Sequence, residues 1–298
     1  MIFNSTLSLI GNTPMVRLEK LGYPNIYVKL EKNNPGGSIK DRAAYYMIKC
    51  AEERNELKYG DVIVEATSGN TGIGISMIGK LKGYKVIIIM PENMSIERRN
   101  LVKAYGAELI LTDKSKGMNG SIEKAKELIS KNLNYKSLTQ FDNKDNPRAH
   151  YETTGVEIYN DLPSIDIFTC GIGTGGTFSG VGKYLKEKNK NIRLIGVEPQ
   201  GSPLISKGIV GKHSIQGIGA NFIPENFDKS ICDEIITVSD EDAFEMVRKL
   251  GEKEGLLLGI SSGANIYVAI EIAKKYKDKN IVTIAPDGID KYMSMGIF

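Results

Sequence analysis

One lysine of this chain follows a loop that could hold a reactive amine in place. Lys40 comes directly after Asn34-Pro35-Gly36-Gly37-Ser38-Ile39 and opens a helical pattern. An amine on such a stiff turn can be partly buried, which lowers its pKa and allows it to form a Schiff base with an aldehyde and to carry a proton. Most lysines are solvated surface charges, so this segment alone favours a surface role for Lys40. Two other loops, taken together with this one, favour the reactive role instead.

The second loop has the composition of an anion site. Thr67-Ser68-Gly69-Asn70-Thr71-Gly72 lies between a predicted strand and a predicted helix. Its glycines let backbone amides point outward, and the start of the helix adds partial positive charge. A helix cap with a tight turn would need only one Thr or Ser and one Gly. Four polar residues with two glycines exceed that need, so the loop predicts anion binding.

The third loop is a second nest of this kind, Gly171-Ile172-Gly173-Thr174-Gly175-Gly176-Thr177. Backbone amides around such glycines, together with the threonine hydroxyls, suit a phosphate group. The same residues fit the G-x-G-x-x-G pattern of dinucleotide-binding folds, and Glu198 ends the next predicted strand, where a ribose-binding acid belongs. An NAD-dependent dehydrogenase is therefore a distant alternative, although it leaves the first two loops without a role.

The other residues that could do chemistry do not predict a metal site. Gly259-Ile260-Ser261-Ser262-Gly263-Ala264 by itself indicates the start of a helix rich in small residues. His150 and His213 are far apart, and no H-x-x-x-H or C-x-x-C motif accompanies them, so no metal site and only structural or surface roles are expected. Glycines and hydroxyls dominate the loops, without a carboxylate pair or a nucleophile triad. The difficult chemistry is therefore expected to belong to a cofactor.

Composition narrows the class of protein. The 298 residues are 41% hydrophobic and 25% charged, as in ordinary globular proteins. The net charge of +3 is spread along the chain, which argues against nucleic-acid binding. Cys50, Cys170 and Cys232 are widely spaced and odd in number, which fits reduced thiols. No apolar run reaches the length of a membrane span and no signal-peptide pattern is present, so we expect a cytoplasmic protein outside the membrane.

Short apolar runs alternate with helical patterns, which predicts an α/β fold of two domains with mainly parallel twisted sheets flanked by helices. The nearly all-apolar run 85–90 indicates a strand buried on both faces. The polar segment 140–147 marks the expected boundary between a smaller N-terminal domain, 1–143, and a larger C-terminal domain, 144–298. The first residues, to about position 35, are expected to pack on the other domain. The predicted strands are 25–30, 61–66, 85–90, 108–112, 165–170, 192–198 and 281–285.

In its motifs the chain resembles the cysteine synthases (O-acetylserine sulfhydrylases), which are pyridoxal-phosphate enzymes of fold type II and are related to cystathionine β-synthase. The resemblance runs from about Gly11 to the C-terminus, with many segments in the right order. The matching segments are Gly11-Asn12-Thr13-Pro14, the Lys40 segment, Thr67–Gly72, Pro91–Arg99, Ala149–Gly155, Gly173–Thr177, Gln216–Ala220 and Gly259–Gly263.

The resemblance implies a role for each candidate site residue. Lys40 would form the Schiff base with pyridoxal 5'-phosphate and then remove the substrate's α-proton. Asn70 would bond the cofactor's ring hydroxyl, and Ser261, ranked ahead of Ser262, would face the pyridine nitrogen. The cofactor phosphate would be held by Gly173, Thr174, Gly175, Gly176 and Thr177. The carboxylate of the amino acid would be bound by Thr67, Ser68, Gly69, Thr71 and Gln140.

The reaction implied is β-replacement on an amino acid through an aminoacrylate intermediate. O-acetylserine and sulfide giving cysteine and acetate is the first expectation. The second is cysteine as the β-donor, with release of hydrogen sulfide and formation of lanthionine, serine or cystathionine. Family members are homodimers as a rule, so the resemblance implies a homodimer, and a serine acetyltransferase is a candidate partner.

Two departures from the family pattern bear on substrate choice. Where the family commonly has Gly-Ile-Gly-Ala-Gly-Phe, this chain has Gly217-Ile218-Gly219-Ala220-Asn221-Phe222. Asn221 is equally well explained as a contact to a different leaving group or nucleophile and as a turn residue with a left-handed backbone. The C-terminal segment Pro286-Asp287-Gly288-Ile289-Asp290-Lys291-Tyr292 also differs, because the family commonly has Pro-Asp-x-Gly-Glu-Arg-Tyr there.

Overall fold

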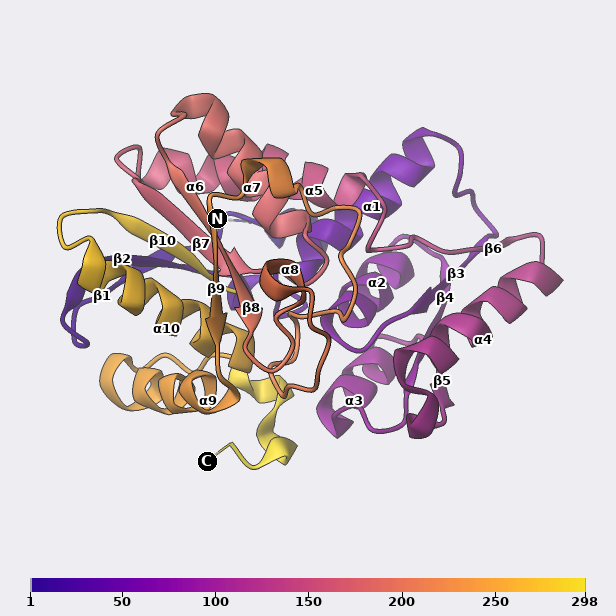
Figure 1. Cartoon of the computed structure of the whole chain (residues 1–298). Coiled ribbons are helices and arrows are strands. Elements are labelled where there is room, and N and C mark those ends of the chain that lie inside the picture. The colour runs from indigo at the N-terminus through magenta and orange to yellow at the C-terminus, as the bar shows by residue number, and fades with distance from the viewer. Residues whose placement is uncertain (1, 298) are drawn as a thin grey trace.

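The computed structural model describes residues 2–297 and contains two sheets side by side (Figure 1). The larger sheet has the strand order β1-β2-β10-β7-β8-β9, and only β1 runs antiparallel to its neighbour. The smaller sheet has the order β5-β4-β3-β6 and is parallel throughout. The expected α/β class with mainly parallel sheets is confirmed.

The chain begins in the larger sheet, crosses to the smaller one and returns. Residues 15–30 therefore share a sheet with the strands that follow residue 166, because β10 lies between β2 and β7. The larger sheet contains β1 (Met15–Leu18), β2 (Tyr23–Leu30), β7 (Ile167–Gly171), β8 (Arg193–Pro199), β9 (Glu234–Val238) and β10 (Ile281–Ala285). The smaller contains β3 (Val62–Ala66), β4 (Lys85–Pro91), β5 (Glu108–Thr112) and β6 (Tyr135–Lys136).

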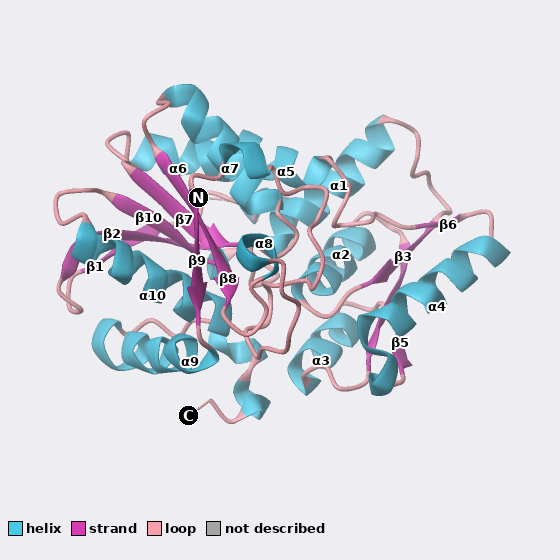
Figure 2. Ribbon diagram, in the orientation of Figure 1, coloured by secondary structure: helices cyan, strands magenta, loops and turns pink. Residues whose placement is uncertain are grey.

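Helices cover both faces of each sheet, and loops gather between the sheets (Figure 2). The larger sheet packs against α9 and α10 on one face and against α6 and α7 on the other, and α5 packs between α7 and α1. On the smaller sheet, α1, α2 and α3 face α4 across the strands. The helices are α1 (Lys40–Glu53), α2 (Asn70–Leu81), α3 (Ile96–Ala104), α4 (Gly117–Lys131), α5 (Asp145–Ala149), α6 (Gly155–Asp161), α7 (Gly176–Lys188), α8 (Leu204–Lys207), α9 (Asp240–Lys249) and α10 (Ile260–Lys275).

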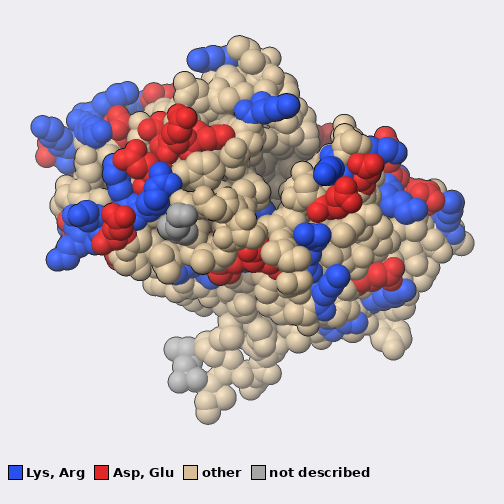
Figure 3. Space-filling model, turned by 90° about the horizontal axis from the view of Figure 1, so that it is seen from below, with Lys and Arg blue, Asp and Glu red and all other residues tan. Residues whose placement is uncertain are grey.

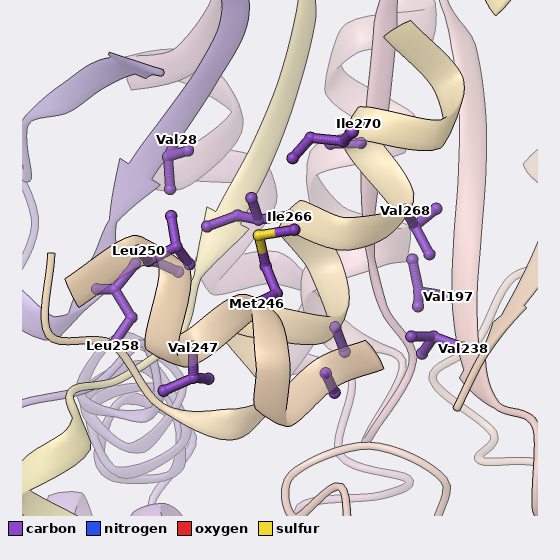
Figure 4. Packing of buried hydrophobic residues seen from close by; sticks show 14 of the residues in the cluster. Val28, Val197, Val238, Met246, Val247, Leu250, Leu258, Ile266, Val268 and Ile270 are labelled. Atoms are coloured by element: carbon purple, nitrogen blue, oxygen red, sulfur yellow. The ribbon is translucent and has the colours of Figure 1, made fainter. Parts of the chain in front are cut away.

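The central strands read as continuous apolar runs because both of their faces are covered. In β4, every residue after Lys85 is buried, as the sequence predicted. On the larger sheet, Val197, Val238 and Val268 come together from β8, β9 and α10 (Figure 4). Each fully buried side chain of this size contributes about 1.5–3 kcal/mol to folding. The apolar clusters on both faces of each sheet hold in place the strands whose loops form the site.

Three of the structure's strands had no counterpart in the sequence prediction. β1 and β6 are too short to carry a strong apolar pattern. β9 is an edge strand as apolar as the predicted β5, and the sequence prediction missed it. The seven predicted strands are all present, with ends that differ by at most two residues. The polar segment 140–147 runs between the sheets and enters α5 at Asp145.

Charged residues of both signs are interspersed on the face seen in Figure 3. Within residues 2–297, no helix combines the length and the apolar composition that crossing a membrane requires.

A buried ion network fixes the start of α1. Arg42 and Glu31 are 1% and 0% exposed, and the guanidinium Nε lies 2.8 Å from the Glu31 carboxylate. Arg42 also pairs with Glu157 of α6 at 2.6 Å, and Lys29 of β2 lies 3.0 Å from the same Glu157 side chain. The first turn of α1 is thereby tied to the larger sheet and to α6.

Replacing Arg42 with Met is expected to lower the free energy of unfolding by about 3–5 kcal/mol, because Glu31 would remain buried without its partner. Urea unfolding followed by circular dichroism measures this, since the chain has no tryptophan. Lys85→Gln is the control, because it breaks an exposed pair with Glu108 worth about 0–1 kcal/mol. Equal losses in the two variants would contradict a special role for the network.

Candidate active site

The predicted loops meet where the carboxyl ends of parallel strands face one another, which is where α/β proteins bind ligands. The loop after β3 carries Thr67–Gly69, the loop after β7 carries Ile172–Gly175, and β10 ends just before Pro286. The Lys40 loop joins them, because Ser38 pairs with Asp287 in a short β-bridge and Ile39 N–H donates to the carbonyl of Pro286 at 2.9 Å. Both sheets therefore contribute to one site.

Lys40 is the first residue of α1 and is partly buried. Burial lowers the pKa of its amine, while the nearby carboxylate of Asp287 acts in the opposite direction and the ammonium of Lys291 adds to the lowering. Among residues 2–297, no side chain or carbonyl forms a hydrogen bond or ion pair with the Lys40 Nζ. The sequence expectation of a partly buried amine with a lowered pKa is met.

Asp287, which sequence reasoning did not select, is the buried carboxylate of the site. It is 0% exposed and accepts hydrogen bonds at Oδ2 from Asn70 Nδ2 at 2.7 Å and from the Tyr292 hydroxyl at 2.6 Å. Its Oδ1 and the Oδ1 of Asn70 are buried without a partner in the described part of the chain. Its position after a buried strand, in Pro286-Asp287-Gly288, was the available signal.

A second buried lysine supports the loop that carries Lys40. The Lys291 Nζ donates to the carbonyls of Gly37 and Gly36 at 2.7 and 3.2 Å. Gly36 N–H in turn donates to Asp41 Oδ2 at 2.6 Å. Burial raises the pKa of Asp41 to about 7 and lowers that of Lys291. The Pro-Gly-Gly turn is thus held from both sides, which fixes the direction of the Lys40 side chain.

The substrate loop expected at 67–71 is linked to Gln140. The Thr71 hydroxyl donates to Gln140 Oε1 at 2.6 Å, and Gly69 N–H donates to Thr67 Oγ1 at 3.3 Å. Thr67, Gly69, Thr71 and Gln140 are buried, whereas Ser68 is exposed. The loop precedes the N-terminus of α2, whose partial positive charge favours an anion here.

The glycine nest at 173–177 is built by close packing that only glycine permits. Gly175 has φ +81°, and a Cβ added at Gly173 would lie 2.2 Å from the carbonyl oxygen of Gly217. A Cβ at Gly176 would meet Asn146 Oδ1 at 2.1 Å. The nest also sits at the N-terminus of α7, a thirteen-residue helix. Its geometry suits a phosphate group.

Neutral side chains surround the nest. Asn146 Nδ2 donates to Thr174 Oγ1 at 3.0 Å, and the Thr177 hydroxyl lies 3.3 Å from His150 Nε2. Burial lowers the pKa of His150 well below its ordinary value. The sequence predicted only a structural or surface role for His150 and did not place it at the nest. Because this imidazole is neutral, the charge of an anion bound at the nest would be balanced by the backbone dipoles.

The two serines at the start of α10 have different environments. Ser262 is 0% exposed, and its hydroxyl donates to the backbone carbonyl of Asp287 at 3.4 Å. Ser261 is 3% exposed, and its hydroxyl has no hydrogen-bond partner within residues 2–297. A Cβ at Gly217 would lie 3.5 Å from the Ser261 Oγ, so this hydroxyl faces the 217 loop. Ser261 is therefore the serine that remains available to a ligand.

Asn221 lies on an exposed turn with φ +61°, as the turn-residue interpretation expected. Its Oδ1 accepts a hydrogen bond from the Ser202 hydroxyl at 2.9 Å. Glu198, the acid on which the dehydrogenase alternative depended, accepts the backbone N–H groups of Ile205 and Ser206 at 2.8 and 3.0 Å. Within residues 2–297, no cluster of His, Cys, Asp or Glu could hold a metal ion.

The arrangement fits a phosphorylated aldehyde cofactor. It combines a free amine at Lys40, a phosphate nest at 173–177 and two polar groups without partners, Asn70 Oδ1 and the Ser261 hydroxyl. A nicotinamide dinucleotide would leave the Lys40 amine unused and would find Glu198 already occupied.

Comparison with known proteins agrees with this chemistry. Residues 6–287 match the family described as pyridoxal-phosphate dependent enzyme. Cysteine synthase B of Campylobacter jejuni is 50% identical, over 97% of both chains. A hydrogen sulfide-producing enzyme of Fusobacterium nucleatum has a TM-score of 0.94 and 49% identity, covering 98% of this chain and 100% of that one.

An O-acetylserine-dependent cystathionine β-synthase of Helicobacter pylori has a TM-score of 0.95 and 42% identity, covering 100% of this chain and 99% of that one. The expected resemblance to the cysteine synthases, their type II fold and their use of pyridoxal phosphate are confirmed, and the dehydrogenase alternative is wrong. The chain belongs to the pyridoxal-phosphate dependent enzyme family and, within it, to the group of the cysteine synthases.

Proposed function

We propose that the protein replaces the β-substituent of an amino acid, converting O-acetylserine and sulfide into cysteine and acetate. The observation that carries the proposal is the position of Lys40. Its partly buried amine, with a lowered pKa, lies where the loops of the two sheets meet, one suited to a phosphate and the other to a carboxylate. Similarity to Campylobacter jejuni cysteine synthase B over nearly the whole chain supports it.

Residues from the loops of both sheets would hold the cofactor. The backbone amides of Gly173, Gly175 and Gly176, with the hydroxyls of Thr174 and Thr177, would bind its phosphate at the start of α7. Asn70 would bond the ring hydroxyl, and Ser261 would face the ring nitrogen. When bound, pyridoxal phosphate supplies an aldehyde for amines and a ring that withdraws electrons from the substrate's α-carbon.

The loop after β3 would hold the substrate. Thr67, Ser68, Gly69 and Thr71 would bind its carboxylate together with Gln140. The N-terminus of α2 adds a favourable dipole for that negative charge. Binding the carboxylate on this loop orients the substrate's α-carbon toward Lys40, and closure of the loop would exclude water.

Lys40 would act as the base. Burial favours the neutral form of its amine, which accepts a proton from the substrate's α-carbon at Nζ. The Asp287 carboxylate nearby then stabilises the ammonium that forms. The same Nζ would return a proton to the α-carbon of the product after the sulfur nucleophile has added.

A second candidate uses cysteine as the β-donor, releasing hydrogen sulfide and forming lanthionine, serine or cystathionine. The 49% identity to the hydrogen sulfide-producing enzyme of Fusobacterium nucleatum favours it. Asn221 would then contact the leaving group or the nucleophile from the loop that packs against the glycine nest.

The proposal extends to assembly and location. The protein would work as a cytoplasmic homodimer, with a serine acetyltransferase as a partner. Residues 1–143 and 144–298 would form two domains, with the first residues packed on the second. The two separate sheets, and the place of β1 and β2 in the larger one, support this division.

Lys40→Ala is expected to abolish turnover and the visible absorbance of the cofactor-bound protein, because no other amine occupies that position. Lys103→Ala, at an exposed lysine of α3, is the control and should behave as the wild type. Turnover and absorbance spectra of the three proteins measure this. Turnover retained by Lys40→Ala would contradict the mechanism.

The lowered pKa of Lys40 predicts a pH effect on the cofactor-free protein. Between the folded and unfolded pKa values, the unfolded chain binds one proton more than the folded chain, so stability should rise with pH in that window. Lys40→Met removes this term and should flatten the curve at alkaline pH. Urea unfolding of both proteins from pH 7 to pH 10 tests the point, and parallel curves would refute it.

One assay distinguishes the two candidate β-donors, O-acetylserine and cysteine. With O-acetylserine and sulfide, we expect cysteine and acetate as products, and with cysteine alone only slow sulfide release. Acetate, cysteine and sulfide are measured with the Lys40→Ala protein as the blank. Sulfide release from cysteine alone that is faster than cysteine synthesis would favour the second candidate.

A further inference from the structure

One buried carboxylate near the substrate loop has no role so far. Glu65, in β3, is 3% exposed. Its Oε2 accepts hydrogen bonds from the Ser137 hydroxyl at 2.9 Å and from the backbone N–H groups of Leu138 and Thr139 at 3.0 and 3.3 Å. Its Oε1 accepts Gln140 N–H at 3.3 Å. A single side chain thus gathers four successive residues, and in the part of the chain that the structure describes it has no ion-pair partner.

The segment that Glu65 gathers has an unfavourable backbone. Thr139 has φ +50°, in the left-handed region that a β-branched residue rarely adopts. Of the described non-glycine residues with positive φ, the other three are Asn12, Asn55 and Asn221, and asparagine tolerates this conformation. Such residues persist only where the surroundings hold them, and they cluster at functional sites. The bonds from 138–140 to Glu65 are the restraint.

The turn at Thr139 determines where Gln140 points. The carbonyl of Gln140 accepts bonds from Asn146 and Asn226 at 2.8 and 3.1 Å, and its side-chain oxygen accepts the Thr71 hydroxyl at 2.6 Å. Within residues 2–297 its NH2 group donates no hydrogen bond. A donor beside the substrate loop is therefore left available for an anion.

We propose that Glu65 is a positioning residue for the substrate's carboxylate: it holds Thr139 in the left-handed turn and so keeps the Gln140 amide beside Thr71. The inference rests on the proposed function, which assigns the amino acid's carboxylate to this loop. Glu65 itself touches no substrate. It acts through the backbone of 138–140.

The test compares L-alanine with L-alaninamide, which differ only at the carboxylate and carry no leaving group. Binding to the cofactor-loaded protein is followed by the change in its visible absorbance. Glu65→Gln should weaken L-alanine binding by about tenfold or more, the value of a hydrogen bond to a charged group. L-alaninamide binding should stay within about twofold, because that ligand offers no carboxylate for Gln140. KM for the amino-acid donor should rise with little change in kcat.

A second substitution separates positioning from general stability. Thr139 is exposed, so Thr139→Asn changes the backbone preference without disturbing a core. Alone it should raise the melting temperature and leave both affinities unchanged. In the Glu65→Gln background it should restore about threefold or more of the lost L-alanine affinity, since asparagine adopts the turn at lower cost. Ser137→Ala is the control. It removes one donor to Glu65 but leaves the three backbone hydrogen bonds, so L-alanine affinity should stay close to that of the wild type.

Each outcome decides between the alternatives. Equal weakening of both ligands by Glu65→Gln, or no weakening at all, would overturn the positioning role, as would a lower melting temperature for Thr139→Asn. If Glu65→Gln alone does not fold, the comparison is made in the Thr139→Asn background, and failure to fold there too would show that Glu65 serves stability only. A wild-type protein that shows no absorbance change with L-alanine would overturn the proposed function instead.

Discussion

The site depends on one buried carboxylate, that of Asp287, and on the charges arranged around it. It binds Asn70 from the smaller sheet's loop and Tyr292 from the C-terminal segment, and it faces the two lysines 40 and 291. A buried carboxylate without such neighbours would be strongly disfavoured. With them, it joins elements of both sheets, and its charge opposes the effect of burial on the pKa of Lys40, as the proposed role of Lys40 as a base requires.

Much of this could be predicted from the sequence, because the determining signals are local. The run 85–90 is apolar at nearly every position, as is typical of a parallel strand buried on both faces. Gly173, Gly175 and Gly176 stand where a backbone must approach closely, and the structure places Asn146, Gly217 and Phe227 against them. The substrate loop and Lys40 were likewise marked by glycines that follow or precede regular elements.

The remaining features arise from tertiary packing and carry no local signal. Glu65 lies in a strand, and nothing in the sequence shows that its carboxylate reaches residues 137–140. Arg42 and Glu31 are charged residues that a pattern assigns to the surface, but both can be buried because Arg42 pairs with Glu31 and with Glu157. The left-handed backbone of Thr139 contradicts its own propensity, so only its surroundings explain it.

The two loops proposed to hold anions are stabilised in different ways, and the difference matches their proposed roles. The nest at 173–177 is fixed by close packing that admits no side chain at its glycines, so it has little freedom to rearrange and suits a group that stays bound. The loop at 67–71 is held by side-chain hydrogen bonds, from Thr71 to Gln140 and from Asn70 to Asp287. A substrate's oxygens can exchange with such bonds at small net cost, because one hydrogen bond replaces another. Under the proposed function, a permanent cofactor and a transient substrate would therefore meet at Lys40, each on a loop whose rigidity matches its role.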